Sequence, residues 1–168
     1  MSRKPLQRFA YPAVVLLLAF STACTTTSPG NPSFLGTTGF LGTGNPMDGS
    51  VSIIDTRNGA FRLVATIPTG PGANIPHFGP DGLVYATAND GDAVTVIDPA
   101  SWERVGRIAG LRGPHWIVFS PDGRRGYVTN SSGATVSVVD LSDRSVIGEL
   151  AVGEGPNGIV LRTPGVGR

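Results

Sequence analysis

A five-residue strand pattern recurs three times in this 168-residue sequence at a nearly constant interval. It reads VSIID at residues 51–55, VTVID at 94–98 and VSVVD at 136–140, so successive copies lie 43 and 42 residues apart. A turn pattern keeps nearly the same interval, as FGPDG at 78–82 and FSPDG at 119–123. Self-similarity at a period of about 20 to 50 residues is the signature of repeat architectures. The repeat therefore limits the chain to folds built from stacked copies of one unit.

Each copy contains residues suited to four short strands. In the third copy these runs are residues 116–119, 126–130, 135–140 and 146–152. A Pro-Asp-Gly turn separates the first two, because proline presets φ, aspartate hydrogen-bonds locally and glycine adopts the left-handed conformation at little steric cost. The 24 glycines and 14 prolines are spread as turn punctuation between Val- and Ile-rich runs. The sequence therefore predicts an all-β fold of four-stranded antiparallel units.

The third copy also carries a family resemblance. It reads GPHWIVFSPDG at 113–123, YVTN at 127–130 and TVSVVD at 135–140. These segments resemble the YVTN β-propeller repeat family, whose name is spelled out by the tetrapeptide. The second copy departs from it with YATA at 85–88, and the first copy lacks a Ser-Pro-Asp-Gly turn. The resemblance implies that residues 47–162 form β-propeller blades.

The number of copies limits what the chain builds alone. Residues 43–67 supply strands two to four of a first blade, two complete blades follow, and residues 158–161 supply a lone first strand. That amounts to about three blades, whereas propellers need at least about four to close. Three explanations remain open. The chain is a piece of a longer propeller, its blades form an open array, or two chains associate so that the last strand of one completes the first blade of the other.

The N-terminal residues have the layout of a bacterial export signal. A basic start is followed by an apolar run over residues 14–20 and by STAC at residues 21–24. This tetrapeptide resembles the lipobox of bacterial lipoproteins, in which the cysteine is acylated and becomes the new N-terminus. We therefore predict a signal peptide at residues 1–23 and lipidation of Cys24. Secretion with an unmodified cysteine and a retained membrane anchor are the alternatives.

The predicted mature chain begins with a flexible linker at residues 24–46, continues with the repeats at 47–162 and ends with a tail at 163–168. The residues after the leader include 10 Lys and Arg against 12 Asp and Glu, a net charge of −2. Such a body lacks the basic surface that nucleic-acid binding requires, so no nucleic acid is expected as a partner. The lipid anchor predicts a location in the cell envelope, on a membrane and facing the periplasm or the exterior. A protein partner and self-association are the other expected interactions.

Few residues suggest chemistry. The two histidines, His77 and His115, occupy non-equivalent positions of the repeat and have no third ligand nearby, so no metal site is predicted. The repeated aspartates stand where turns favour them, and neither a Gly-x-Ser-x-Gly nor a Cys-x-x-Cys-His motif is present. We therefore predict no catalytic residue and no cofactor. Trp102 and His115 are the candidates for a binding surface.

These patterns favour a non-enzymatic, membrane-tethered binding or scaffold module. The alternative is a fragment of, or a subunit related to, a propeller enzyme such as a lactonase or an electron-transfer protein, because propellers related to this family include both. A product without independent function is the third hypothesis.

Overall fold

The structure, a computed structural model, describes residues 39–57 and 61–162. The predicted signal peptide, the lipidation site Cys24 and the tail at 163–168 lie outside these residues. In the described part of the chain, no helix is long and apolar enough to cross a membrane.

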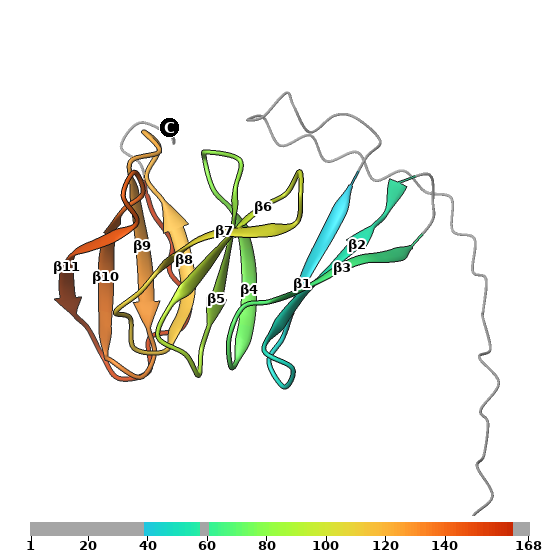
Figure 1. Cartoon of the computed structure of the whole chain (residues 1–168). Helices are drawn as coiled ribbons and strands as arrows, with labels where there is room; N and C mark the ends of the chain where they lie inside the picture. Colours follow the sequence, from blue (N-terminus) through green and yellow to red (C-terminus); the bar gives the residue numbers. More distant parts are fainter. Residues whose placement is uncertain (1–38, 58–60, 163–168) are drawn as a thin grey trace, which may run out of the picture. The chain divides into compact units, whose positions relative to one another are not determined.

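The described strands form three antiparallel sheets, in which every strand pairs with neighbours in sequence (Figure 1). Blade A consists of β1 (Phe40–Asn45), β2 (Ser50–Asp55) and β3 (Arg62–Pro68). Blade B consists of β4 (Ala73–Phe78), β5 (Val84–Ala88), β6 (Val94–Asp98) and β7 (Glu103–Ile108). Blade C consists of β8 (Pro114–Phe119), β9 (Arg125–Asn130), β10 (Thr135–Asp140) and β11 (Ser145–Ala151). The predicted all-β fold with about three antiparallel blades is confirmed.

The outer two strands of every blade share one irregularity. A β-bulge shifts the register at the same repeat position in each blade, and an extra residue there increases the local twist. The shifts fall between Ile53 and Ile54, between Val96 and Ile97, and between Val138 and Val139. Equivalent residues of the three blades can therefore be compared directly.

Apolar side chains fill the spaces between successive blades. Between blades A and B the buried residues are Val51, Ile53, Ile67, Val84, Ala86 and Ile97. Between blades B and C they are Tyr85, Val94, Val96, Ile108, Leu111, Ile117, Val128, Val139 and Leu141. Blade B thus buries one face against blade A and the other against blade C, and this burial is the main driving force for stacking.

A buried asparagine ties the second strand of a blade to the third. The Nδ2 of Asn130 donates to the hydroxyls of Thr135 at 2.9 Å and Ser137 at 2.7 Å. Asn45 donates in the same way to two serines of β2, whereas blade B has Ala88 at this position. The asparagine that ends the YVTN tetrapeptide therefore has a structural role inside its own blade.

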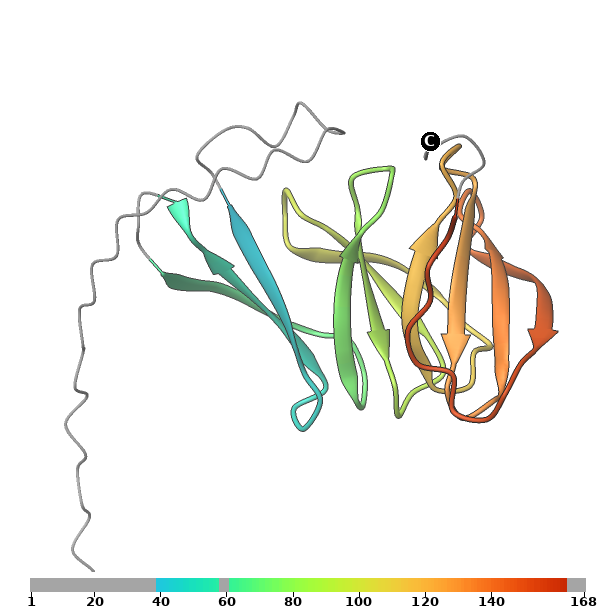
Figure 2. The same ribbon diagram turned by 180° about the vertical axis from the view of Figure 1, so that it is seen from behind.

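Two segments differ from expectation. Residues 40–45 lie within the range 24–46, for which we predict a flexible linker, yet they form β1 and pair along their whole length with β2. Residues 158–161 are predicted to be a strand but form none. A strand requires a hydrogen-bonded neighbour, and no described strand pairs with this segment. Figure 2 shows the chain after β11 turning back beside the strands of blade C.

Candidate functional site

The repeated aspartates act in turns. The backbone N–H groups of Arg57, Ala100 and Ser142 donate to the aspartates two residues before them, at 2.8 to 3.0 Å. The guanidinium of Arg57 also binds Asp55 and lowers the pKa of that carboxyl to about 2. These contacts favour a structural role for the carboxylates at the strand ends.

The other aspartate series has the same role. Asp81 accepts from the backbone N–H of Leu83 at 3.1 Å and from the hydroxyl of Tyr85 at 2.8 Å. Burial, together with this bond, raises the pKa of Tyr85 well above its usual value. Asp122 accepts from the backbone N–H of Arg124 at 3.1 Å. Both carboxylates close the turn between the first two strands of a blade.

The two sequence-predicted surface residues lie at opposite ends of the blades. Trp102 is in the β6–β7 turn, and its ring packs edge-on against Phe40 at 5.0 Å between centroids. Its φ of 60° recurs at Arg144, the equivalent turn residue of blade C, so this left-handed conformation belongs to the repeat. His115 lies in β8, close to the end where β7 connects to blade C. Trp102 and His115 therefore belong to separate surfaces.

The histidines lie on the first strands of blades B and C. The imidazole of His77 packs against Trp116 at 5.1 Å between ring centroids, and burial lowers the pKa of His77. Its Nε2 and the Nδ1 of His115 are buried and have no hydrogen-bond partner in the part of the chain that the structure describes. Within the described ranges, no group of three or more His, Cys, Asp or Glu residues could hold a metal ion.

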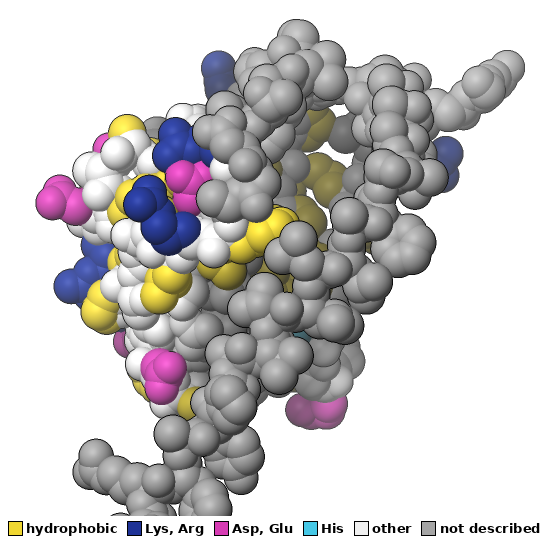
Figure 3. Space-filling model, turned by 90° about the vertical axis from the view of Figure 1, so that its right-hand side faces the viewer, with side chains coloured by type: hydrophobic (Ala, Val, Ile, Leu, Met, Phe, Trp, Pro, Cys, Tyr) yellow, Lys and Arg dark blue, Asp and Glu magenta, His cyan; other side chains and the backbone are white. Residues whose placement is uncertain are grey.

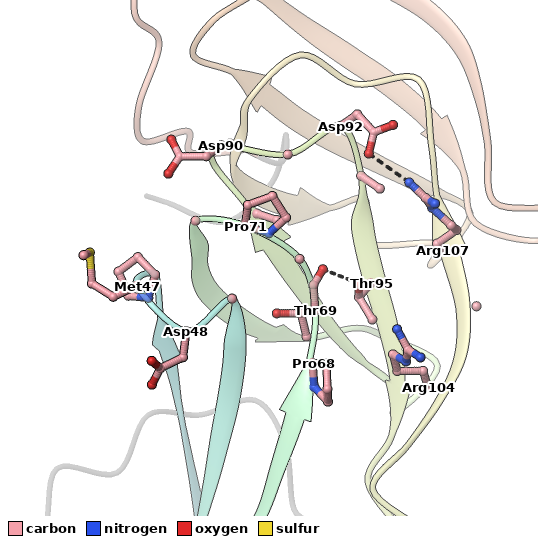
Figure 4. A pocket seen from close by; sticks show the side chains of 18 residues that line it. Met47, Asp48, Pro68, Thr69, Pro71, Asp90, Asp92, Thr95, Arg104 and Arg107 are labelled. Carbon is pink, nitrogen blue, oxygen red and sulfur yellow. Dashed lines mark hydrogen bonds and ion pairs between the residues drawn. The ribbon is translucent and has the colours of Figure 1, made fainter.

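A cavity of about 1080 Å³ lies where blades A and B meet (Figure 4). Its lining comes from the β1–β2 turn, the β3–β4 connection, the β5–β6 turn and β7. Glycine and proline dominate the first two segments, which read Pro46-Met47-Asp48-Gly49 and Pro68-Thr69-Gly70-Pro71-Gly72. Because the side chains there are small, backbone atoms line much of this part of the cavity.

Charged and polar groups of both signs line the cavity. The guanidinium of Arg107 binds Asp92 at 2.9 Å, whereas Arg104, on the same strand, forms no ion pair with a described residue. Thr69 is 7 % exposed, and its hydroxyl has no hydrogen-bond partner within residues 39–57 and 61–162, although its carbonyl accepts from Thr95 at 3.0 Å. A buried hydroxyl without a partner costs free energy unless a bound molecule satisfies it. Thr69 and Arg104 are therefore the groups best placed to bind a polar ligand.

The sequence did not reveal this cavity. Its lining residues belong to two blades and come from turns, where the repeat pattern is weakest. One signal was present at Thr69, whose N–H donates to Gly49 as the N–H of Leu111 donates to Asp92. Leu111 is buried in the apolar space between blades B and C. A threonine in the place of that leucine marks the space between blades A and B as more polar.

Solved structures with a similar fold are propeller-type proteins. Hydrazine synthase of Kuenenia stuttgartiensis matches with a TM-score of 0.61 and 25 % identity over 72 % of this chain and 34 % of that one. A periplasmic gluconolactonase of Pseudomonas aeruginosa matches with a TM-score of 0.52 and 24 % identity over 67 % of this chain and 36 % of that one. A putative 6-phosphogluconolactonase of Bacteroides fragilis matches with a TM-score of 0.55 and 19 % identity, over 67 % and 35 %.

The described blades are therefore β-propeller blades, and the chain spans about a third of the length of these proteins. No protein-family model matches the chain, and no curated protein matches it by sequence. The resemblance to the YVTN repeat family accordingly continues to rest on the residues quoted from the sequence.

Proposed function

We propose that this chain provides the propeller blades of a lipid-anchored protein in the bacterial cell envelope, facing the periplasm or the exterior, and acts there as a non-enzymatic binding module. The observation that carries the proposal is the cavity between blades A and B, in which a buried Thr69 hydroxyl and the Arg104 guanidinium have no hydrogen-bond or charge partner among the described residues. The aspartates that could suggest catalysis are engaged in turns. The anchor is the lipid on Cys24.

The chemistry of the cavity fits a small polar anion. Arginine is the side chain best suited to carboxylates, since its planar guanidinium donates two parallel hydrogen bonds. The Thr69 hydroxyl would serve a ligand hydroxyl, and the open Gly-Pro turns would let a ring approach the backbone. A sugar acid carries both groups, so gluconate is the probe of choice.

Gluconate is expected to bind the full chain and to bind the Arg104→Gln variant at least about tenfold more weakly, because a hydrogen bond to a charged group contributes about 1.5 to 3 kcal/mol. Isothermal titration calorimetry measures both affinities. Arg112→Gln is the matched control, since Arg112 is exposed and lies outside the cavity. Equal affinities of the two variants would contradict the assignment of the site.

The anchor is tested by Cys24→Ser. Without a thiol to acylate, the protein is expected to move almost completely from the membrane fraction to the soluble envelope fraction, because each buried methylene of the lipid contributes about 0.8 kcal/mol. Immunoblotting of the two fractions measures the shift. The Thr27→Ser variant keeps Cys24 and should stay on the membrane. Membrane retention of Cys24→Ser would sink the lipoprotein assignment.

The second candidate is a piece of, or a subunit related to, a propeller enzyme such as a lactonase or an electron-transfer protein. Its support is the likeness to a gluconolactonase and the fact that the chain spans about a third of the similar structures. Supplying gluconolactone in place of gluconate separates the two candidates. Binding without turnover favours the binding module, whereas enzyme-dependent release of gluconate favours the lactonase.

A further inference from the structure

One face of blade C is apolar, and no described blade packs on it as blade C packs on the equivalent face of blade B. In blade B, the face toward blade C is fully buried, with Ile108 at 0 % and Leu111 at 2 % exposure. The equivalent residues of blade C, Leu150 and Val152, are 59 % and 44 % exposed. The rest of the face repeats Tyr85, Val94 and Val96 of blade B as Tyr127, Val136 and Val138 of blade C.

The outer face of blade A is the chemical counterpart. The bulge places Ile54 and Leu63 opposite each other, as it places Val139 and Val146 in blade C. In blade C this pair packs against blade B, in the cluster that contains Ile108. In blade A, Leu63 is 59 % exposed. Figure 3 views the side on which blade A lies, and hydrophobic side chains reach the surface there.

The edge of β1 and residues 158–161 also complement each other. In blade A, β1 has β2 as its one described neighbour, whereas β5 and β9 are each covered by a first strand. The hydroxyl of Thr87 donates to the carbonyl of His115 in the next first strand at 2.9 Å. The hydroxyl of Thr129 donates in the same way to the carbonyl of Asn157 at 2.7 Å. Residues 158–161 therefore start where a next first strand would start, but pair with no described strand.

We infer that a second copy of this chain docks head to tail, with its blade A on the exposed face of blade C. Residues 158–161 of the first copy then pair with β1 and form a first strand for that blade, which has none among its described strands. A second copy is the expected partner because of the two internal interfaces. In each of them, the face equivalent to the exposed face of blade C packs against the face equivalent to the outer face of blade A. A head-to-tail contact that repeats must either close or grow into a filament. Two copies with three described blades each exceed the roughly four blades that a closed propeller needs, so we expect two such contacts to close a ring of two copies.

The register of the new pairing follows from blades B and C. There Pro76 lies opposite Ala86, and Ile117 lies opposite Val128. The positions equivalent to these in the proposed contact are Ile159 of one copy and Thr43 of the other. These two residues are thus expected to face each other across the interface between copies. They are not paired with each other within one chain.

The mass of the full lipidated chain in detergent, measured by native mass spectrometry, tests the association. Two copies are expected, and the Leu150→Lys variant should release single copies, because it puts a charge on an apolar interface while the side chain is exposed in one chain alone. A wild-type monomer would overturn the inference. A mass unchanged by Leu150→Lys would also overturn it.

Cysteine cross-linking tests the head-to-tail geometry. Thr43→Cys and Ile159→Cys are prepared as separate full-length proteins, and each is oxidised alone and after mixing. The mixture is expected to form a disulfide-linked dimer on a non-reducing gel, while each variant alone stays at the level of the wild type, in which Cys24 is the one cysteine. Dimers from either variant alone, or none from the mixture, would overturn the proposed contact. Circular dichroism of each variant confirms that the blades are folded.

Discussion

The Gly44→Ala variant is expected to lose about 3 kcal/mol of its free energy of unfolding. A Cβ at Gly44 would overlap the backbone carbonyl oxygen of Asn74 in β4, and a backbone atom in a paired strand cannot move aside. This position is a threonine in blades B and C, where the hydroxyl donates to the backbone of the segment that follows the blade. In blade A the two backbones touch directly.

The matched control for this variant is Gly148→Ala. Gly148 also lies in a strand, but no atom stands within 4 Å of the Cβ that alanine would add. Its stability should be unchanged or rise by about 0.5 kcal/mol, since alanine restricts the unfolded chain. Urea unfolding followed by circular dichroism compares the two variants. Equal stabilities would mean that blades A and B are not in direct backbone contact.

Truncation of Ile108 is expected to cost about 2 to 5 kcal/mol, as is usual when a buried isoleucine becomes alanine. Ile108 is 0 % exposed and lies in the cluster between blades B and C. Its loss would leave a cavity that the β-sheets are too rigid to fill. The expected result is an unfolding transition at lower urea concentration with an unchanged slope.

Val105→Ala is the comparison on the same strand. Val105 is 42 % exposed, so its truncation should cost less than about 1 kcal/mol. A large effect at both positions would show that β7 tolerates no change at all. A small effect at both would show that the space between blades B and C does not hold the molecule together.

Most of the fold was predictable because the repeat combines spacing with turn chemistry. Strands β6 and β10 match their predicted runs of residues 94–98 and 135–140, since alternating valines and a terminal aspartate define both ends. Strand β1 begins earlier than the repeat alignment indicates. Its glycines at positions 42 and 44 have low β propensity, and the strand is stabilised by pairing with β2 and by contact with β4.

The cavity and the behaviour of residues 158–161 were beyond the sequence for a different reason. A strand depends on a neighbour, and residues 158–161 have the composition of a strand without one among the described residues. The cavity depends on turns from two blades that lie more than 50 residues apart at its extremes, from Pro46 to Arg107. Neither property is contained in a local pattern, and the one hint of the cavity was the polar Thr69 in the place of the apolar Leu111.

The hydrogen bonds from a blade to the segment that follows it have a consequence for how such chains can change. The hydroxyls of Thr87 and Thr129 donate to backbone carbonyls, one belonging to a histidine and the other to an asparagine. A backbone carbonyl is present whatever the side chain. The residue that follows a blade can therefore be replaced freely while the hydrogen bond persists, and a copied blade finds its docking bond already supplied by the blade before it. Gain or loss of a whole blade therefore disturbs these hydrogen bonds less than replacement of the threonine does.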